Sequence, residues 1–226
     1  MFAFDGTERP AQQEFVVIAR GGFAEFIAMM MFVYFGCGAA SSNLTKAGGE
    51  WDPAATSVVA LQFGFGITVL AFATAHSSGG HINCAVTWCL TLAGKCHPLT
   101  AVAYLICQIA GSISGALLLS ATTKGSDPAL DRTGGVGANG FQNDTVTAGN
   151  AFLGEFMGTF LLCFVVLESA VNTQAVTMEG ERGIRGNKQN LAPLAIGLAV
   201  FMAHAPTPNP YPTRTAQPIS RSDASS

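Results

Sequence analysis

A short stretch at residues 77–88, with the sequence SSGGHINCAVTW, separates two long apolar segments and restricts the fold more than any other feature of the chain. Two adjacent glycines precede Asn83, and Asn is a residue type that caps helices. A single membrane-crossing helix would not be interrupted in this way. The pattern therefore predicts a re-entrant segment, in which a loop descends to mid-membrane and a capped half-helix over residues 83–93 returns to the same side. Irregular backbone at that depth is tolerated only where it is buried in protein or lines a watery path, so the stretch predicts a pore or a binding site.

The membrane setting follows from composition. Hydrophobic residues make up 49% of the chain and charged residues only 11%, and the mean hydropathy is +0.38. Soluble domains usually carry about 25% charged residues. The net charge of −3 argues against a nucleic-acid partner. At about 20 residues per span, the length allows about five or six crossings.

The predicted fold is an all-α polytopic membrane protein. We expect a cytoplasmic N-terminal segment at residues 1–20, a transmembrane domain at residues 21–205, and a disordered Pro-, Ser- and Thr-rich tail at residues 206–226. The expected spans are residues 21–40, 56–75, 99–121, 149–170 and 191–205, with the half-helix after the second. The fifth apolar run reaches only about 22 Å, against a hydrocarbon core of about 30 Å. We therefore interpret the tail as a frameshift or splice product that cuts the last span short, with a genuine disordered tail as the alternative.

Lys and Arg residues favour an inner N-terminus, because most of them then lie in cytoplasmic segments. This orientation places Asn43 and Asn143, each in an Asn-x-Thr sequon, outside the membrane, where glycans can be attached. The chain is accordingly expected in the plasma membrane or an internal membrane, as a multi-pass protein.

An internal repeat places two acidic residues in equivalent positions. Glu25 follows Ala24 in the first expected span, and Glu155 follows Gly154 in the fourth. The second copy begins three spans after the first, an odd offset, so they have opposite orientations, as in the inverted repeats of many transport folds. We expect each carboxyl group to accept hydrogen bonds from backbone donors that a re-entrant loop leaves free.

Asn83 is the sharpest functional candidate. Its side chain can cap the half-helix, and its amide can also face a pore beside the partial positive charge of the helix N-terminus. Such a site would donate a hydrogen bond to water and repel cations. Plain helix capping is the structural alternative. His76, His81, Cys84 and Cys89 allow a metal-binding alternative, and the first three a heme-binding one, but no tight zinc spacing is present. No catalytic grouping stands out, so we expect no enzyme activity, metal or cofactor.

These residues resemble the aquaporins of the major intrinsic protein family. The resemblance covers residues 21–204, about four-fifths of the chain, and is carried by residues 24–26, 79–87, 154–156 and 191–197. It implies a channel for the passive transport of water or small neutral solutes, in a tetramer whose protomers each hold a pore. It also implies that Asn83, Cys84 and Ala85 form a pore motif supported by His81, Glu25 and Glu155. Phe63 and His204 correspond to two positions of the family's selectivity filter.

The chain departs from the family pattern in two ways. Cys84 stands where the family motif has proline, which adds a backbone donor at the first helical position. The second half-helix, the filter arginine and the sixth span have no counterpart after His204. We therefore expect a C-terminally truncated form with little channel activity alone. The alternative is a non-conducting regulatory subunit that joins full-length protomers.

Overall fold

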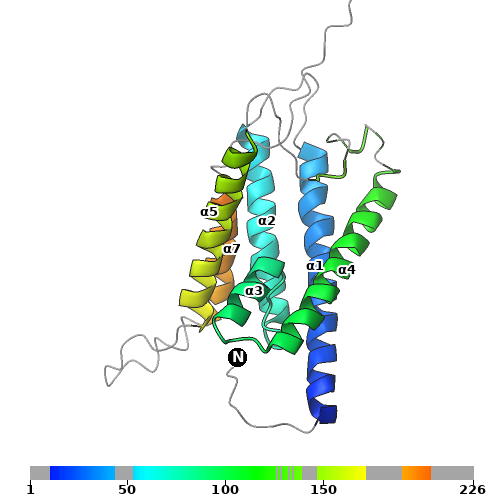
Figure 1. The fold of residues 1–226 in the computed structure, drawn as a ribbon. Coiled ribbons are helices and arrows are strands. Elements are labelled where there is room, and N and C mark those ends of the chain that lie inside the picture. The colour runs from blue at the N-terminus through cyan, green and yellow to red at the C-terminus, as the bar shows by residue number, and fades with distance from the viewer. Residues whose placement is uncertain are drawn as a thin grey trace, which may run out of the picture.

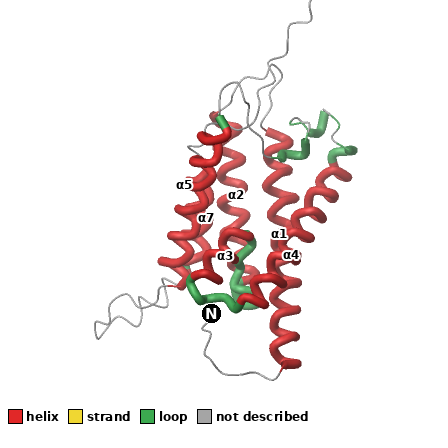
Figure 2. The backbone as a smooth tube through the Cα atoms, viewed as in Figure 1, coloured by secondary structure: helices red, strands yellow, loops and turns green. Residues whose placement is uncertain are grey.

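A computed structural model of the chain describes residues 11–43, 53–125, 127, 129–131, 133, 135–138, 147–171 and 190–204. Within these residues every regular element is a helix (Figures 1 and 2). The elements are α1 (Ala11–Asn43), α2 (Pro53–Thr74), α3 (Cys84–Leu92), α4 (Pro98–Thr122), α5 (Ala148–Val166), the π-helical turn η1 (Leu167–Val171) and α7 (Ala192–His204). The all-α fold expected from the sequence is confirmed, and residues 206–226 lie outside the described part.

Among the described residues, four helices are long and apolar enough to cross a membrane: α1, α2, α4, and α5 together with η1. They correspond to the first four expected spans, and the protein is a multi-pass membrane protein. Helix α7 has 13 residues and is shorter than a full crossing. Helix α1 begins at Ala11, well before the expected start at residue 21. Glu14 lies in its first turn, where an acidic side chain is favourable to a helix.

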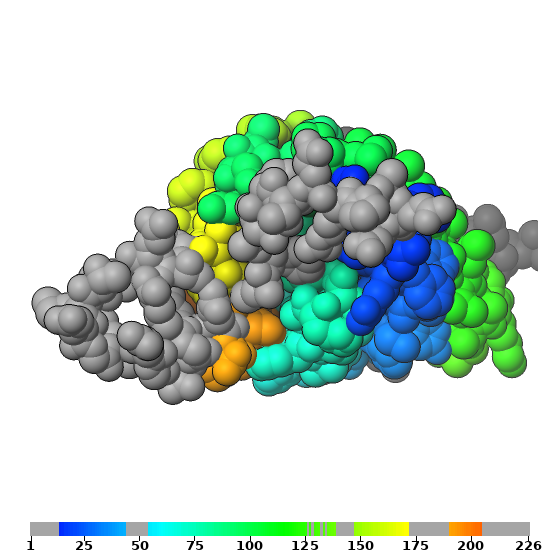
Figure 3. Space-filling model, turned by 90° about the horizontal axis from the view of Figure 1, so that it is seen from below, coloured from blue at the N-terminus to red at the C-terminus, as the bar shows by residue number. Residues whose placement is uncertain are grey.

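The long helices form a curved row around α3. Contacts connect α5 to α7, α7 to α2, α2 to α1, and α1 to α4. The short helix α3 contacts α4 and α5, the two ends of that row, and lies in front of it in Figure 1. Seen from below in Figure 3, the orange α7 and cyan α2 lie along one edge of the molecule, and green helices lie along the opposite edge. The row therefore holds the half-helix against its concave side.

Glycines set the two closest helix contacts. A Cβ on Gly111 of α4 would collide with the Phe26 carbonyl oxygen of α1. A Cβ on Gly197 of α7 would collide with the Thr68 hydroxyl and the Gly64 carbonyl oxygen of α2. Small residues at these positions let the backbones approach closely, which is how helices associate in lipid. The α2–α7 contact is central, with α1 beside α2 and α5 beside α7, as the predicted inverted repeat requires.

Candidate functional site

The segment between α2 and α3 is re-entrant and depends on left-handed backbone. Helical turns continue past the end of α2, since the Ser77 amide donates to the Thr74 carbonyl oxygen at 2.8 Å. Gly79 and Gly80 then have φ of 95° and 66°, and Ile82 has φ of 47°. A Cβ on Gly80 would also lie 3.1 Å from the Ala71 Cα atom. Glycine removes the steric cost at residues 79 and 80 and lets the loop lie against α2, whereas a positive φ is costly for the β-branched Ile82.

Glu25 fixes this loop from α1. Its side chain is fully buried, and its carboxyl oxygens accept four hydrogen bonds. Oε1 accepts from the Ser78 hydroxyl at 2.5 Å and from the His81 amide at 2.9 Å. Oε2 accepts from the Ile82 amide at 2.7 Å and from Gln108 Nε2 at 2.8 Å. The two backbone donors lie where irregular chain would otherwise leave them unpaired in a low-dielectric setting, so Glu25 supplies acceptors that the loop cannot find in itself.

A buried network continues from Glu25 to the start of α3. Gln108 Nε2 of α4 also donates to the Thr87 hydroxyl at 3.0 Å, and that hydroxyl donates to the Asn83 carbonyl oxygen at 3.1 Å. His81 Nδ1 lies 3.2 Å from the same hydroxyl, and its ring meets the Tyr104 ring edge-on, with centroids 5.2 Å apart. His81 therefore supports the re-entrant segment from inside the protein.

The half-helix α3 begins at Cys84 directly after its cap. Asn83 has extended backbone, and its Oδ1 accepts from the Ala85 amide at 2.8 Å and the Val86 amide at 3.2 Å. Nine residues of helix reach about 14 Å, or about half of the hydrocarbon core. Asn83 is partly exposed, and its Nδ2 has no hydrogen-bond partner among the described residues. The amide is thus available to a ligand beside the positive end of a helix dipole.

Phe63 of α2 and His204 of α7, the two filter positions suggested by the sequence, lie against each other. Their rings stack with centroids 4.8 Å apart and planes 13° apart. His204 Nδ1 lies 2.8 Å from the Val200 carbonyl oxygen, which can only accept, so Nδ1 is the donor. Phe63 also meets the Phe32 ring edge-on at 5.3 Å. Stacked rings at this separation leave no space for a water molecule between them.

Glu155 differs from its repeat partner. It is exposed on α5, and no hydrogen-bond partner exists for it among the described residues, whereas Glu25 is enclosed. Its neighbours Phe152, Phe156 and Phe160 form an exposed stack with centroids 6.3 and 6.4 Å apart. Within the described part, therefore, only one of the two repeat-related carboxyl groups accepts hydrogen bonds from a loop.

The remaining sequence candidates are placed as follows. Asn43 lies in the last turn of α1, where its Nδ2 donates to the Ala39 carbonyl oxygen at 2.8 Å, and Asn143 lies outside the described residues. In the part of the chain that the structure describes, no three His, Cys, Asp or Glu side chains meet in a way that could hold a metal ion. The metal and heme alternative thus has no ligand cluster there.

Ser78, Thr87 and Gln108 belong to the candidate site although no sequence motif indicates a role for them. All three are almost fully buried and belong to the Glu25 network. Gln108 carried a usable signal, because an amide in the middle of an apolar span needs a polar partner. The pairing itself joins residues 83 positions apart, and no local pattern reveals it.

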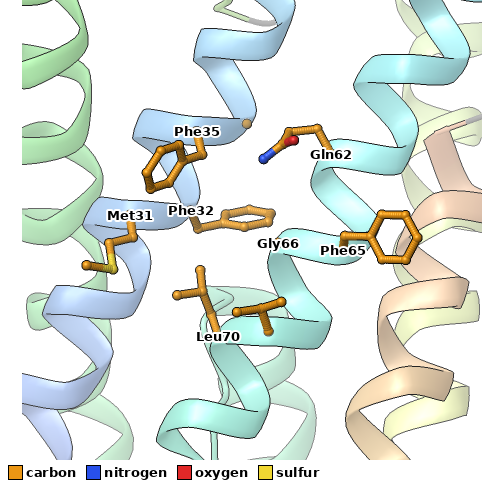
Figure 4. A pocket seen from close by; sticks show the side chains of 9 residues that line it. Met31, Phe32, Phe35, Gln62, Phe65, Gly66 and Leu70 are labelled. Carbon is orange, nitrogen blue, oxygen red and sulfur yellow. The ribbon is translucent and has the colours of Figure 1, made fainter.

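A separate cavity of about 350 Å³ lies between α1 and α2 (Figure 4). Its walls are apolar side chains apart from the Gln62 amide and two glycines, Gly36 and Gly66. Phe35 and Phe65 on its rim are exposed. Four of its nine lining residues are exposed and none belongs to α3, so we assign it no part in the candidate site.

Comparisons with known proteins agree with this geometry. The major intrinsic protein family matches residues 12–211. The aquaporin PIP-type of Atriplex canescens is 39% identical over 191 residues, which cover 83% of this chain and 62% of that protein. The probable aquaporin PIP1-5 of Arabidopsis thaliana is 37% identical over 193 residues, covering 83% and 61%. The chain thus spans less than two thirds of the length of these curated relatives.

A solved structure is also similar. The X-ray structure of the aquaglyceroporin from Plasmodium falciparum matches with a TM-score of 0.63 at 17% identity, covering 83% of this chain and 72% of that one. At that identity the match shows a common fold.

Proposed function

The chain belongs to the major intrinsic protein family, and from this premise we propose that it contributes to a passive membrane pore for water. The observation that carries the proposal is the position of Asn83. It caps a half-helix that the buried Glu25 network holds in place, with its Nδ2 unpaired among the described residues. Relatives named as aquaporins support water as the solute.

The proposed mechanism uses the half-helix terminus and one amide. Asn83 Nδ2 would donate to the oxygen of a passing water molecule, which turns that molecule's hydrogens away from the site. The partial positive charge at the start of α3 would disfavour cations at the same depth. Cys84, at the first helical position, keeps a backbone N–H that the helix itself cannot satisfy. That amide is a second donor which proline would not offer.

Phe63 and His204 are proposed as the narrow part of the pathway. Their stacked contact supports a constriction at this level, formed by one residue from α2 and one from α7. Flux would require the rings to separate. A small side chain at either position would widen the path and admit larger neutral solutes such as glycerol.

The pore is proposed to be completed by further protein beside α5. The described helices surround α3 on one side, and Glu155 is exposed at the position where Glu25 holds its loop. We therefore expect this chain alone to add little water permeability. Tetramers with one pore per protomer are the proposed assembly. The exposed Glu155 also favours a second candidate function, a regulatory subunit that associates with full-length protomers through this face.

Osmotic shrinkage of lipid vesicles, followed by stopped-flow light scattering, tests these proposals. Vesicles would contain this chain, a PIP-type aquaporin, or both. Higher water permeability with both proteins than with the relative alone supports a conducting role, and its loss in Asn83→Ala supports the role of the amide. A permeability below that of the relative alone, with co-purification, supports the regulatory role. Co-reconstitution with no change and no association would reject both.

Phe63→Ala separates the filter from general folding effects. It should raise the ratio of glycerol to water permeability, because the ring no longer narrows the path. Phe35→Ala is the matched control, since Phe35 of α1 is exposed and is not part of the Phe63–His204 pair. Equal ratios for the two variants would contradict the proposed constriction.

A further inference from the structure

Two cysteine thiols from different elements meet beside the half-helix. The Cys163 sulfur of α5 lies 4.0 Å from the Ala85 carbonyl oxygen of α3. The thiols of Cys163 and Cys89 are also close enough to interact electrostatically. In an α-helix the Ala85 carbonyl accepts from the amide four residues later, which is that of Cys89. The two observations therefore place the Cys163 sulfur at the turn of α3 that carries Cys89.

The pair is accessible and differs from the other cysteines. Both thiols are only partly buried, as is Asn83 near the start of the same half-helix. Cys107 of α4 lies against Gly22 of α1, and the Cys96 thiol is directed at the His97 carbonyl oxygen at 3.7 Å. Since no third ligand joins the pair within the described residues, a tetrahedral metal site is not supported. A pair of thiols without a third ligand can still be joined by oxidation.

We propose that Cys89 and Cys163 form an oxidation site at which hydrogen peroxide produces a reversible disulfide between α3 and α5. One thiol, as its thiolate, attacks a peroxide oxygen, the O–O bond breaks, and a sulfenic acid and one water molecule form. The second sulfur attacks the sulfenic sulfur and displaces its oxygen as a second water molecule. The two sulfurs lose two electrons in total, and one peroxide is reduced to two water molecules. A dithiol reagent reverses the step by exchange.

The cross-link would join the half-helix to the opposite end of the helix row. The Glu25 network holds α3 from α1 and α4, whereas α5 has no hydrogen bond to α3 stronger than the weak sulfur contact among the described residues. A disulfide would therefore restrict the side of α3 that the network leaves free. The inference does not depend on water conduction, because it concerns a bond and not a flux.

Peptide mapping of the full chain in lipid vesicles tests the proposal. The protein is treated with hydrogen peroxide, remaining thiols are blocked with N-ethylmaleimide, and disulfide-linked peptides are identified by mass spectrometry. The Cys89–Cys163 peptide pair should be the most abundant intramolecular disulfide, and dithiothreitol should remove it. It should be absent from Cys89→Ser and Cys163→Ser, and unchanged in the control Cys37→Ser, whose residue lies on α1.

Two results would overturn the proposal. The first is a preference of Cys163 for Cys84 or Cys96. The second is an absence of the Cys89–Cys163 pair while other cysteines are oxidised by the same treatment. Both results are measured on the unsubstituted protein, so they test the proposed disulfide even if a serine variant fails to fold.

Discussion

Replacing Glu25 should destabilise the re-entrant segment, and by less in Glu25→Gln than in Glu25→Ala. In Glu25→Gln, the new NH₂ group replaces one of two oxygens that each accept from one backbone amide and one side chain. Gln108 can turn its own amide oxygen toward the NH₂ group, and Ser78 can accept through its hydroxyl oxygen. The backbone amides of His81 and Ile82 cannot make that change. Whichever way the new amide is oriented, one backbone N–H loses its acceptor.

The size of each effect follows from this count. One buried backbone donor without a partner costs about 1–3 kcal/mol, so Glu25→Gln should destabilise the segment by about that amount. Glu25→Ala leaves both backbone donors unpaired, for about 2–6 kcal/mol, before any cost of the cavity left by the side chain. Since whole proteins are stable by only about 5–15 kcal/mol, the alanine variant threatens the fold and the glutamine variant perturbs it locally.

Amide hydrogen exchange with mass spectrometry, on protein in lipid nanodiscs, measures this effect. Peptides covering residues 79–92 should exchange about five- to 150-fold faster in Glu25→Gln, because each 1.4 kcal/mol corresponds to about a tenfold change. Peptides from α7 should change less. Glu155→Gln is the matched control: the chemical change is the same, but Glu155 is exposed and has no partner among the described residues. Its exchange pattern should match that of the unmodified chain.

The reasoning would be refuted if Glu25→Gln left exchange in residues 79–92 unchanged. It would also be refuted if the two glutamine variants had equal effects, since that would show that burial and hydrogen bonding of Glu25 do not distinguish it.

Two further predictions concern packing and the loop after α4. Gly197→Ala should lower the free energy of unfolding by about 1–3 kcal/mol, because its Cβ collides with α2. The control Gly38→Ala, whose Cβ would lie 3.5 Å from Leu119, should be neutral or slightly stabilising. Equal melting temperatures for the two variants would reject the close α2–α7 contact. Asp131 has its pKa lowered, because hydrogen bonds from Thr133 and the Val136 amide outweigh burial, which acts to raise it. The stability that ionised Asp131 contributes is therefore complete above the ordinary Asp pKa of about 3.9, and it is lost as the pH falls through the lower pKa of the folded state. Asp131→Asn should lower the free energy of unfolding by about 1 kcal/mol at neutral pH, as measured by unfolding at a series of pH values. The difference in this free energy between the variant and the unmodified chain should shrink below about pH 4. A difference that does not depend on pH would contradict this assignment.

Several features of this protein could be predicted from the sequence because their causes are local. Long apolar runs can form spans wherever they occur, so the positions of α2, α4 and α5 follow from hydropathy. Gly79, Gly80 and Asn83 determine the re-entrant turn and its cap, because positive φ and a capping side chain are properties of those residue types. The start of α1 at Ala11 was missed, since a helix can extend beyond the membrane without an apolar signal.

The tertiary structure decided what those local features are used for. Glu25 and Glu155 occupy equivalent places in the repeat, yet one is enclosed by four donors and the other is exposed. Their difference depends on whether a loop distant in sequence packs against each of them, and periodicity contains no information on that. The approach of Cys163 to the turn of α3 that carries Cys89 arises in the same way, from the contact of α3 with α5. Sequence alone determined the elements and their caps, and the packing of distant segments determined which polar groups are buried together.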